Sequence, residues 1–120
     1  MSEAKNPASI TGYHAHIYYD EASRERAARV RELIESSFKV IMGRWRDMPV
    51  GPHPQAMYQV AFGTDEFSRF VPWLMLNRDG LTVLVHPETG DPYTDHAVNP
   101  LWLGEKLTLN VEMLRNLPKG

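Results

Sequence analysis

Five histidines are the residues of this chain best suited to do chemistry. None of them lies in a segment whose pattern predicts a helix. Each stands in a predicted strand or in a loop, where its direction can be fixed. Neutral imidazole is the commonest protein ligand for transition metals. A metal centre is therefore the first hypothesis, and its ligands would come from His14, His16, His53, His86 and His96.

The hydrophobic pattern predicts four main strands and two helices. Apolar side chains recur at three- and four-residue spacing over residues 27–38 and 67–74, which is typical of amphipathic helices. Strands are expected where β-branched and aromatic residues gather, over residues 10–19, 38–45, 56–62 and 81–86. This order is that of a ferredoxin-like fold, an α+β split βαβ sandwich with an antiparallel sheet and helices on one face.

The remaining segments are expected to add little to that core. Residues 1–9 are polar and are predicted to form a flexible leader, and residues 87–100 a polar loop. Residues 108–111 suggest another short strand. A chain of 120 residues is long enough for one core, so we expect residues 10–120 to form a single domain.

Strand parity places three of the histidines together. Side chains alternate between the two faces of a strand, so His14, His16 and Tyr18 share one face of the first strand. His86 lies on the less apolar face of the fourth strand. The more apolar faces should meet the helices, which leaves these residues on the open face. In the split βαβ order the first and fourth strands are antiparallel neighbours, and His86 should lie beside His14.

Imidazoles at such positions can converge on one ion, because directly opposed Cβ atoms are about 5 Å apart. His53 stands between Pro52 and Pro54, which preset its direction, and it joins the others if its loop folds back. The chain has no cysteine, so nitrogen and oxygen must hold the metal. Three neutral nitrogens with open positions suit zinc or iron(II). The ligand types leave both metals open.

Composition bears on partners and location. A formal net charge of -2 offers no basic surface for nucleic acid, so none is expected as a partner. No apolar run approaches the roughly 20 residues that cross a bilayer, and the first residues lack the apolar stretch of a secretory signal. We therefore expect no membrane partner and a cytoplasmic location.

Several short motifs, in this order along the chain, resemble the DOPA 4,5-dioxygenase family of bacteria and fungi. The resemblance runs from about residue 12 to residue 111. Several short motifs in the order of the family are more specific than any single motif. The motifs are Tyr13–Tyr19 (YHAHIYY), Gly51–Pro54 (GPHP) followed by Met57, Trp73–Arg78 (WLMLNR), Leu84–Asp91 (LVHPETGD), Asp95–His96, and Leu101–Gly104 (LWLG).

The resemblance implies a non-haem iron(II) extradiol dioxygenase that opens catechol rings, such as that of DOPA, with O₂. It also implies a ferredoxin-like fold, and a homodimer is expected. Three of His14, His16, His53 and His86 would bind the metal, with zinc as a substitute for iron. The fourth, or His96, would be the catalytic acid–base group.

Other side chains are candidates for further roles at such a site. Tyr18 would hydrogen-bond the catechol or the bound oxygen. Arg44 or Arg78 would hold a substrate carboxylate through two parallel hydrogen bonds. Familiar extradiol enzymes often use two histidines and a carboxylate, and Asp95 and Glu112 are the weak candidates for such a ligand.

Two other classes of function stay open. A zinc hydrolase or isomerase on the same histidines would work with redox-inert zinc and without O₂. A non-catalytic, dimeric ligand- or metal-binding module would bury apolar residues of the open face, such as Met57 and Leu84, across a two-fold axis. It would leave no room for a catechol.

Overall fold

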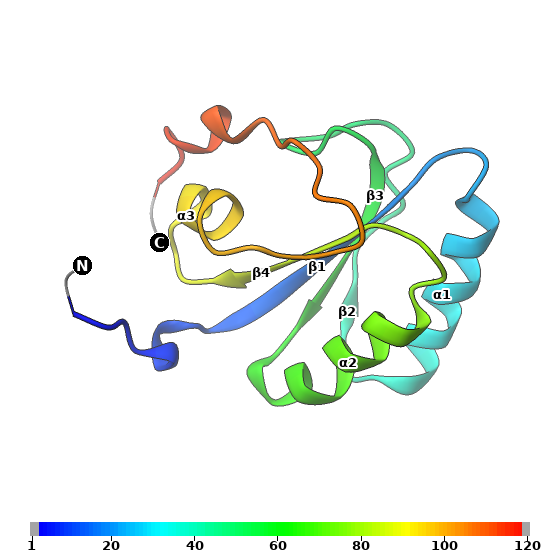
Figure 1. Cartoon of the computed structure of the whole chain (residues 1–120), viewed down its shortest axis with the longest axis horizontal. Coiled ribbons are helices and arrows are strands. Elements are labelled where there is room, and N and C mark those ends of the chain that lie inside the picture. Colours follow the sequence, from blue (N-terminus) through cyan, green and yellow to red (C-terminus); the bar gives the residue numbers. More distant parts are fainter. Residues whose placement is uncertain (1–2, 119–120) are drawn as a thin grey trace.

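The computed structural model describes residues 3–118 and confirms the ferredoxin-like α+β fold. Five strands form one antiparallel sheet in the order β2-β3-β1-β4-β5 (Figure 1). The elements are β1 (Gly12–Tyr19), α1 (Arg24–Ser37), β2 (Ile41–Met42), β3 (Ala56–Phe62), α2 (Phe67–Asn77), β4 (Val83–Glu88), α3 (Pro92–Ala97) and β5 (Leu101–Leu103), with 3-10 turns at Pro7–Ser9, Thr64–Glu66 and Val111–Leu114.

Two ends of the chain fall outside this description. Residues 1–2 of the predicted leader and residues 119–120 of the predicted domain lie outside the described residues. Within residues 3–118, no helix combines the length and the apolar character needed to cross a bilayer.

α1 and α2 cover one face of the sheet, as the sequence pattern predicts (Figure 1). α1 buries Ala27, Val30 and Ile34 in the main core, while Leu33, which belongs to the same apolar stripe, is exposed. The alternate, more apolar residues of β1 and β4 belong to the same core, together with residues of α2 and β3. A side chain such as Ile17, on the central strand, is fully buried there. The predicted helix-facing parity is confirmed.

The central strand β1 pairs with β3 on one side and with β4 on the other. His14 is directly opposite His86 in the β1–β4 register, so the predicted neighbour relation is confirmed. Pro87 continues β4 although it has no N–H to donate. It is tolerated because β5 pairs only as far as Val85, so no partner requires a donor on that side.

Two sequence predictions after β4 are wrong. Residues 108–110 form no strand; instead Leu101–Leu103 pairs with the free edge of β4, where its side chains alternate between the two faces. The segment 87–100 is not all loop, because it contains α3. Asp91 caps that helix by accepting a hydrogen bond from the Thr94 N–H, and a proline follows in the first turn.

The face away from α1 and α2 is less open than predicted. α3 and the segment 104–118 lie over it, seen in yellow and in orange to red in Figure 1. A second apolar cluster forms there, in which Trp102, Leu107 and Leu109 pack on Tyr18, Met57 and Leu84. The prediction of helices on one face therefore holds for α1 and α2 but not for α3.

Candidate metal centre

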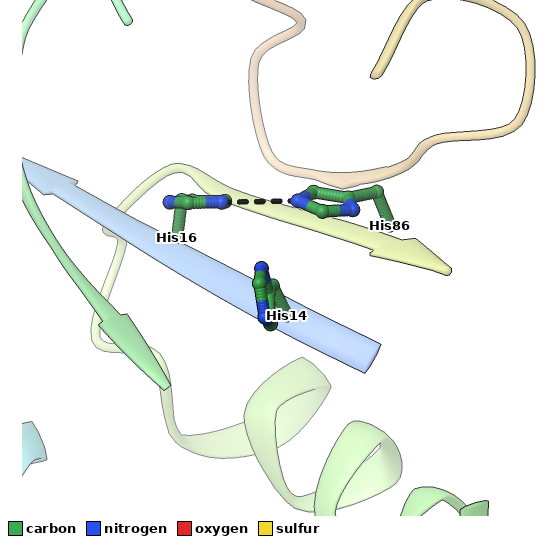
Figure 2. Close-up of side chains that lie close together, drawn as sticks. All are labelled: His14, His16 and His86. Carbon is green, nitrogen blue, oxygen red and sulfur yellow. Dashed lines mark hydrogen bonds between the residues drawn. The ribbon is translucent and has the colours of Figure 1, made fainter. Parts of the chain in front are cut away.

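The sheet brings His14, His16 and His86 together on its central strand β1 and the neighbouring strand β4 (Figure 2). His16 and His86 face each other with their Nε2 atoms 3.1 Å apart. The His14 ring centroid lies 5.1 Å from that of His86 and 6.0 Å from that of His16. One ring nitrogen of each residue lies within 4.8 Å of the other two. These three residues, called the strand triad below, form a group that could hold a metal ion.

His53 and His96 join the cluster from outside these strands. The loop before β3 folds back so that the His53 ring centroid is 4.2 Å from that of His16. The His96 ring centroid is 4.0 Å from that of His86. His16, His53 and His96 form a second group with ring nitrogens within 4.8 Å. The prediction that no histidine lies in a helix is wrong for His96, which α3 carries.

Hydrogen bonds at Nδ1 fix the direction of two of these rings. Nδ1 of His86 lies 3.0 Å from the carbonyl oxygen of Pro87, and Nδ1 of His96 lies 2.8 Å from that of Pro92. A carbonyl oxygen only accepts, so both rings carry their proton on Nδ1. Each ring therefore presents the lone pair of Nε2, which is the arrangement typical of a histidine that binds a metal.

Glu88 is a site residue that the sequence analysis missed. One of its carboxylate oxygens lies 3.1 Å from Nδ1 of His14 and 3.5 Å from Nδ1 of His86. Burial, followed by the nearby Asp95 carboxylate, raises the pKa of Glu88. The signal was present in the sequence, because Glu88 follows His86 by two residues and so shares its face of β4. A carboxylate at this position orients imidazoles toward a metal.

Replacing Glu88 by Ala is expected to weaken metal binding by about 10- to 100-fold, because His14 loses the group that holds its ring. The fold should be kept, since the Glu88 side chain is 38 % exposed. Anaerobic titration calorimetry measures the dissociation constant, and Glu35→Ala on the outer surface of α1 is the matched control. An affinity unchanged by the Glu88 substitution would contradict this role.

Burial favours the neutral form of every ring in the cluster. Desolvation, with a smaller contribution from neighbouring histidines, lowers the pKa of His53 to about 4 and that of His86 to about 3. Desolvation is also the main reason that the pKa values of His14, His16 and His96 are lowered. Neutral imidazole is the form that binds a metal, so all five rings are available for that role near neutral pH.

The donor set fits a transition metal. Nδ1 of His16 lies 3.5 Å from the sulfur of Met57, which leaves Nε2 directed at His86. Two Nε2 lone pairs 3.1 Å apart would repel each other. Either one of the two Nε2 atoms carries a proton, or both bind the same cation. Two ligands at right angles on bonds of about 2.1 Å would be about 3.0 Å apart. The separation of 3.1 Å allows this arrangement and is equally that of an N–H···N hydrogen bond between the two rings.

A cavity of about 540 Å³ opens over the cluster, a size in the range of small-molecule sites. Residues from the loop before β3, from α3 and from the C-terminal segment surround it. His86 is buried beneath it and is not part of its wall. The wall includes His14, His16, His53 and His96, together with Arg44, Arg46, Gln59, Leu114 and Leu117.

The other predicted site residues fall in different places. Tyr18 is buried beside the cluster, with its hydroxyl 2.6 Å from Nδ1 of His53. Arg44 lines the cavity, whereas Arg78 follows the last residue of α2 and is not part of the cavity wall. Both oxygens of Asp95 accept hydrogen bonds from Thr89, which commits this carboxylate to holding the turn after β4.

Glu112, the other predicted carboxylate ligand, is far less buried than Asp95. It pairs with Arg115 at 2.8 Å in the turn Val111–Leu114. It is not part of the cavity wall. The carboxylate that the structure brings to the histidines is therefore Glu88, through Nδ1 of His14.

Comparisons with known proteins show the family to which this chain is similar. The model of the Dopa 4,5-dioxygenase family matches residues 13–113. A DOPA 4,5-dioxygenase of Amanita muscaria is 30 % identical, over 92 % of this chain and 51 % of that protein. An uncharacterized 21.2 kDa protein of Botryotinia fuckeliana is 36 % identical, over 88 % of this chain and 64 % of that protein. The chain thus spans between about half and two thirds of the length of these relatives.

A solved structure is also similar over nearly its whole length. A crystal structure from Nostoc punctiforme, provisionally described as a dioxygenase, is 59 % identical and superposes with a TM-score of 0.92. The match covers 93 % of this chain and 97 % of that one. The resemblance that the sequence motifs indicate is confirmed, and the chain belongs to the Dopa 4,5-dioxygenase family.

Proposed function

We propose that the chain is a non-haem iron(II) extradiol dioxygenase that opens the ring of a catechol, such as DOPA, with O₂. The observation that carries this proposal is the strand triad, whose ring nitrogens converge beneath a cavity of about 540 Å³. Membership of the family supports the reaction class. The name of the Amanita muscaria relative supports the substrate class.

The strand triad would hold the metal. Its three residues lie on paired strands in the middle of the sheet, and Nδ1 of each has a neighbour that turns Nε2 inward. When bound, iron(II) supplies the electron transfer that lets an electron-rich ring react with O₂, and it lowers the pKa of a catechol hydroxyl. Zinc fits the same nitrogens but does not change oxidation state.

His53 would move protons. Its Nδ1 lies 2.6 Å from the Tyr18 hydroxyl, which can donate or accept, unlike the carbonyl oxygens that face His86 and His96. Burial raises the pKa of Tyr18, so the hydroxyl keeps its proton. When Tyr18 donates to Nδ1, Nε2 of His53 carries a proton that it can give. When Tyr18 accepts from Nδ1, Nε2 is a base.

His96 would orient the substrate. Because its Nδ1 donates to Pro92, its Nε2 is an acceptor at the cavity wall, beside His16 and His53. A catechol hydroxyl is a donor that this nitrogen would accept. His53 and His96, whose rings lie next to those of His16 and His86, would thus handle the two hydroxyl protons.

The alternatives are less well supported. Met57 and Leu84 are buried by the chain's own C-terminal segment, and the cavity leaves room for a small aromatic ring. Both observations count against a non-catalytic module whose histidine face is a dimer interface. A zinc hydrolase would use the same nitrogens, but membership of a dioxygenase family favours the oxygen chemistry. A homodimer stays a prediction from the resemblance.

The test is anaerobic loading with iron(II), addition of a panel of catechols, and admission of O₂. The expected result is O₂ uptake together with a yellow ring-opened semialdehyde. Zinc-loaded protein is the matched control and should be inactive. The proposal is wrong if no catechol causes O₂ uptake, and hydrolysis by the zinc form without O₂ would favour the hydrolase.

A further inference from the structure

We propose that Arg44 and Arg46 select catechols that carry an anionic side chain and no ammonium group. This inference rests on the proposed function, because it assumes that the catechol ring lies at the histidine cluster. It names the substrate class more narrowly than that function does. Arg46 is a residue to which the sequence analysis gave no role.

A β-bulge brings the two arginines to the cavity. Met42 pairs with Val60, and further along Arg46 pairs with Met57. Three residues separate the two pairings on the β2 side, but only two on the β3 side. One additional residue on one strand defines a bulge, a feature that often re-aims side chains beside active sites.

The bulge changes the face on which the side chains lie. Met42 packs against the helix-covered core, so regular alternation would send Arg44 and Arg46 the same way. Because of the additional residue, Arg46 takes the face of its partner Met57, which is the histidine face. Trp45 turns instead to the core. Both arginines line the cavity.

Gly43 permits the bulge. Its N–H donates to the carbonyl oxygen of Gln59 at 2.7 Å. A Cβ atom at Gly43 would lie 3.2 Å from that oxygen and 3.3 Å from the Cβ of Gln59, which is tighter than ordinary packing. A residue without a side chain therefore avoids a tight contact where the two strands approach. The position of the arginines is thus built into the sequence.

Among the described residues, the cavity wall carries two arginines that have no ion-pair partner and two carboxylates that already have hydrogen-bonding partners. Among residues 3–118, neither arginine of the bulge makes an ion pair or a side-chain hydrogen bond, and both are exposed. The carboxylates of the wall already have hydrogen-bonding partners, since Glu88 contacts His14 and Asp95 accepts from Thr89, but these partners are neutral and the carboxylates keep their charge. A substrate carboxylate would find two unpaired guanidinium groups here, whereas a substrate ammonium group would have to compete with contacts already made.

The chemistry of the guanidinium group sets the expected preference. Its planar fork binds a carboxylate through two parallel hydrogen bonds, and two such groups repel a cation. Among catechols that differ only in the side chain, the one with a propionate group should therefore be preferred. The zwitterion DOPA should come between this anion and the cation dopamine.

The test compares catechols of similar size that differ in side-chain charge: 3,4-dihydroxyphenylpropionate, DOPA, 4-ethylcatechol and dopamine. We expect kcat/KM for the propionate to exceed that for dopamine by about tenfold or more. Arg46→Gln should bring this ratio down toward one. Arg46→Lys keeps the positive charge but not the planar guanidinium group, so its ratio should lie between those of the wild type and Arg46→Gln. Arg29→Gln on the exposed surface of α1 is the matched control and should leave the ratio unchanged.

Turnover and binding measurements distinguish a failure of the proposed anion selectivity from a failure of the proposed dioxygenase function. Equal turnover of the propionate and dopamine would overturn the selectivity and leave the dioxygenase standing. If no catechol is cleaved, calorimetry on the iron-loaded protein without O₂ still measures binding. Preferential binding of the propionate that Arg46→Gln abolishes would then support the anion site alone, and equal binding of all four compounds would overturn it.

Discussion

The His16→Ala variant is expected to bind iron(II) more than about 100-fold more weakly than the wild type and to lose ring cleavage. His16 belongs to both histidine groups that could hold a metal, so its loss breaks each of them. Loss of a group that merely orients a metal ligand costs about 10- to 100-fold, and loss of a ligand itself should cost more. Anaerobic calorimetry measures the affinity, and O₂ uptake measures the reaction.

Gln59→Ala is the matched control for this substitution. Gln59 lies opposite His16 in the β1–β3 register and lines the same cavity, but it has no imidazole. Its variant should bind iron(II) as the wild type does. Because His16 is buried, thermal unfolding must show that His16→Ala is folded. His14→Ala, at a position 27 % exposed, gives a second test with less risk to folding. Wild-type affinity in both histidine variants would contradict the assignment of the strand triad.

The His53→Gln variant is expected to keep iron(II) affinity within a few-fold and to lose ring cleavage by a factor of about 100 to 10,000. This range is what positioned acid–base catalysis contributes. The reason is that His53 is the ring whose Nδ1 partner, the Tyr18 hydroxyl, allows either nitrogen to carry the proton. The measurement is kcat under saturating catechol and O₂, alongside the dissociation constant for iron(II).

The Tyr18→Phe variant tests the contribution of the Tyr18 hydroxyl separately from that of the His53 ring. It removes the hydroxyl that faces Nδ1 of His53 and keeps the aromatic ring, which packs in the second apolar cluster. We expect a smaller loss of kcat than in His53→Gln and a changed pH profile of kcat. If His53→Gln loses iron(II) binding instead of turnover, His53 is a ligand and the division of roles proposed here is wrong.

Strand parity explains why much of the fold and part of the site follow from the sequence. The alternation in β1 is clear, since Ile17 and its alternate neighbours are apolar or aromatic and His14 and His16 are not. In β4 it rests on His86, because Leu84 on the same face is apolar. With the split βαβ order, that alternation is enough to predict the pairing of His14 with His86. The same alternation, continued from His86 to the next residue on that face, would have predicted that Glu88 lies beside the histidines.

Other features depend on contacts that periodicity does not encode. His96 reaches the cluster because Asp91 caps a short helix, and α3 is too short to show a helical repeat. Arg46 reaches the cavity because one additional residue between Met42 and Arg46 reverses the alternation. The predicted strand 38–45 shrinks to Ile41–Met42, because the bulge interrupts it after Met42 and Phe38 still caps α1 at its start. Leu101–Leu103 becomes a strand because the edge of β4 is free to pair.

The position of the metal can be seen in an anomalous-difference map, recorded at the iron edge, from crystals loaded with iron(II) without O₂. We expect a single strong peak bounded by the ring nitrogens of His14, His16 and His86, with His53 and His96 outside bonding distance, if the assignment of the strand triad is right. A peak among His16, His53 and His96, or no peak at the cluster when iron is bound elsewhere, would contradict it.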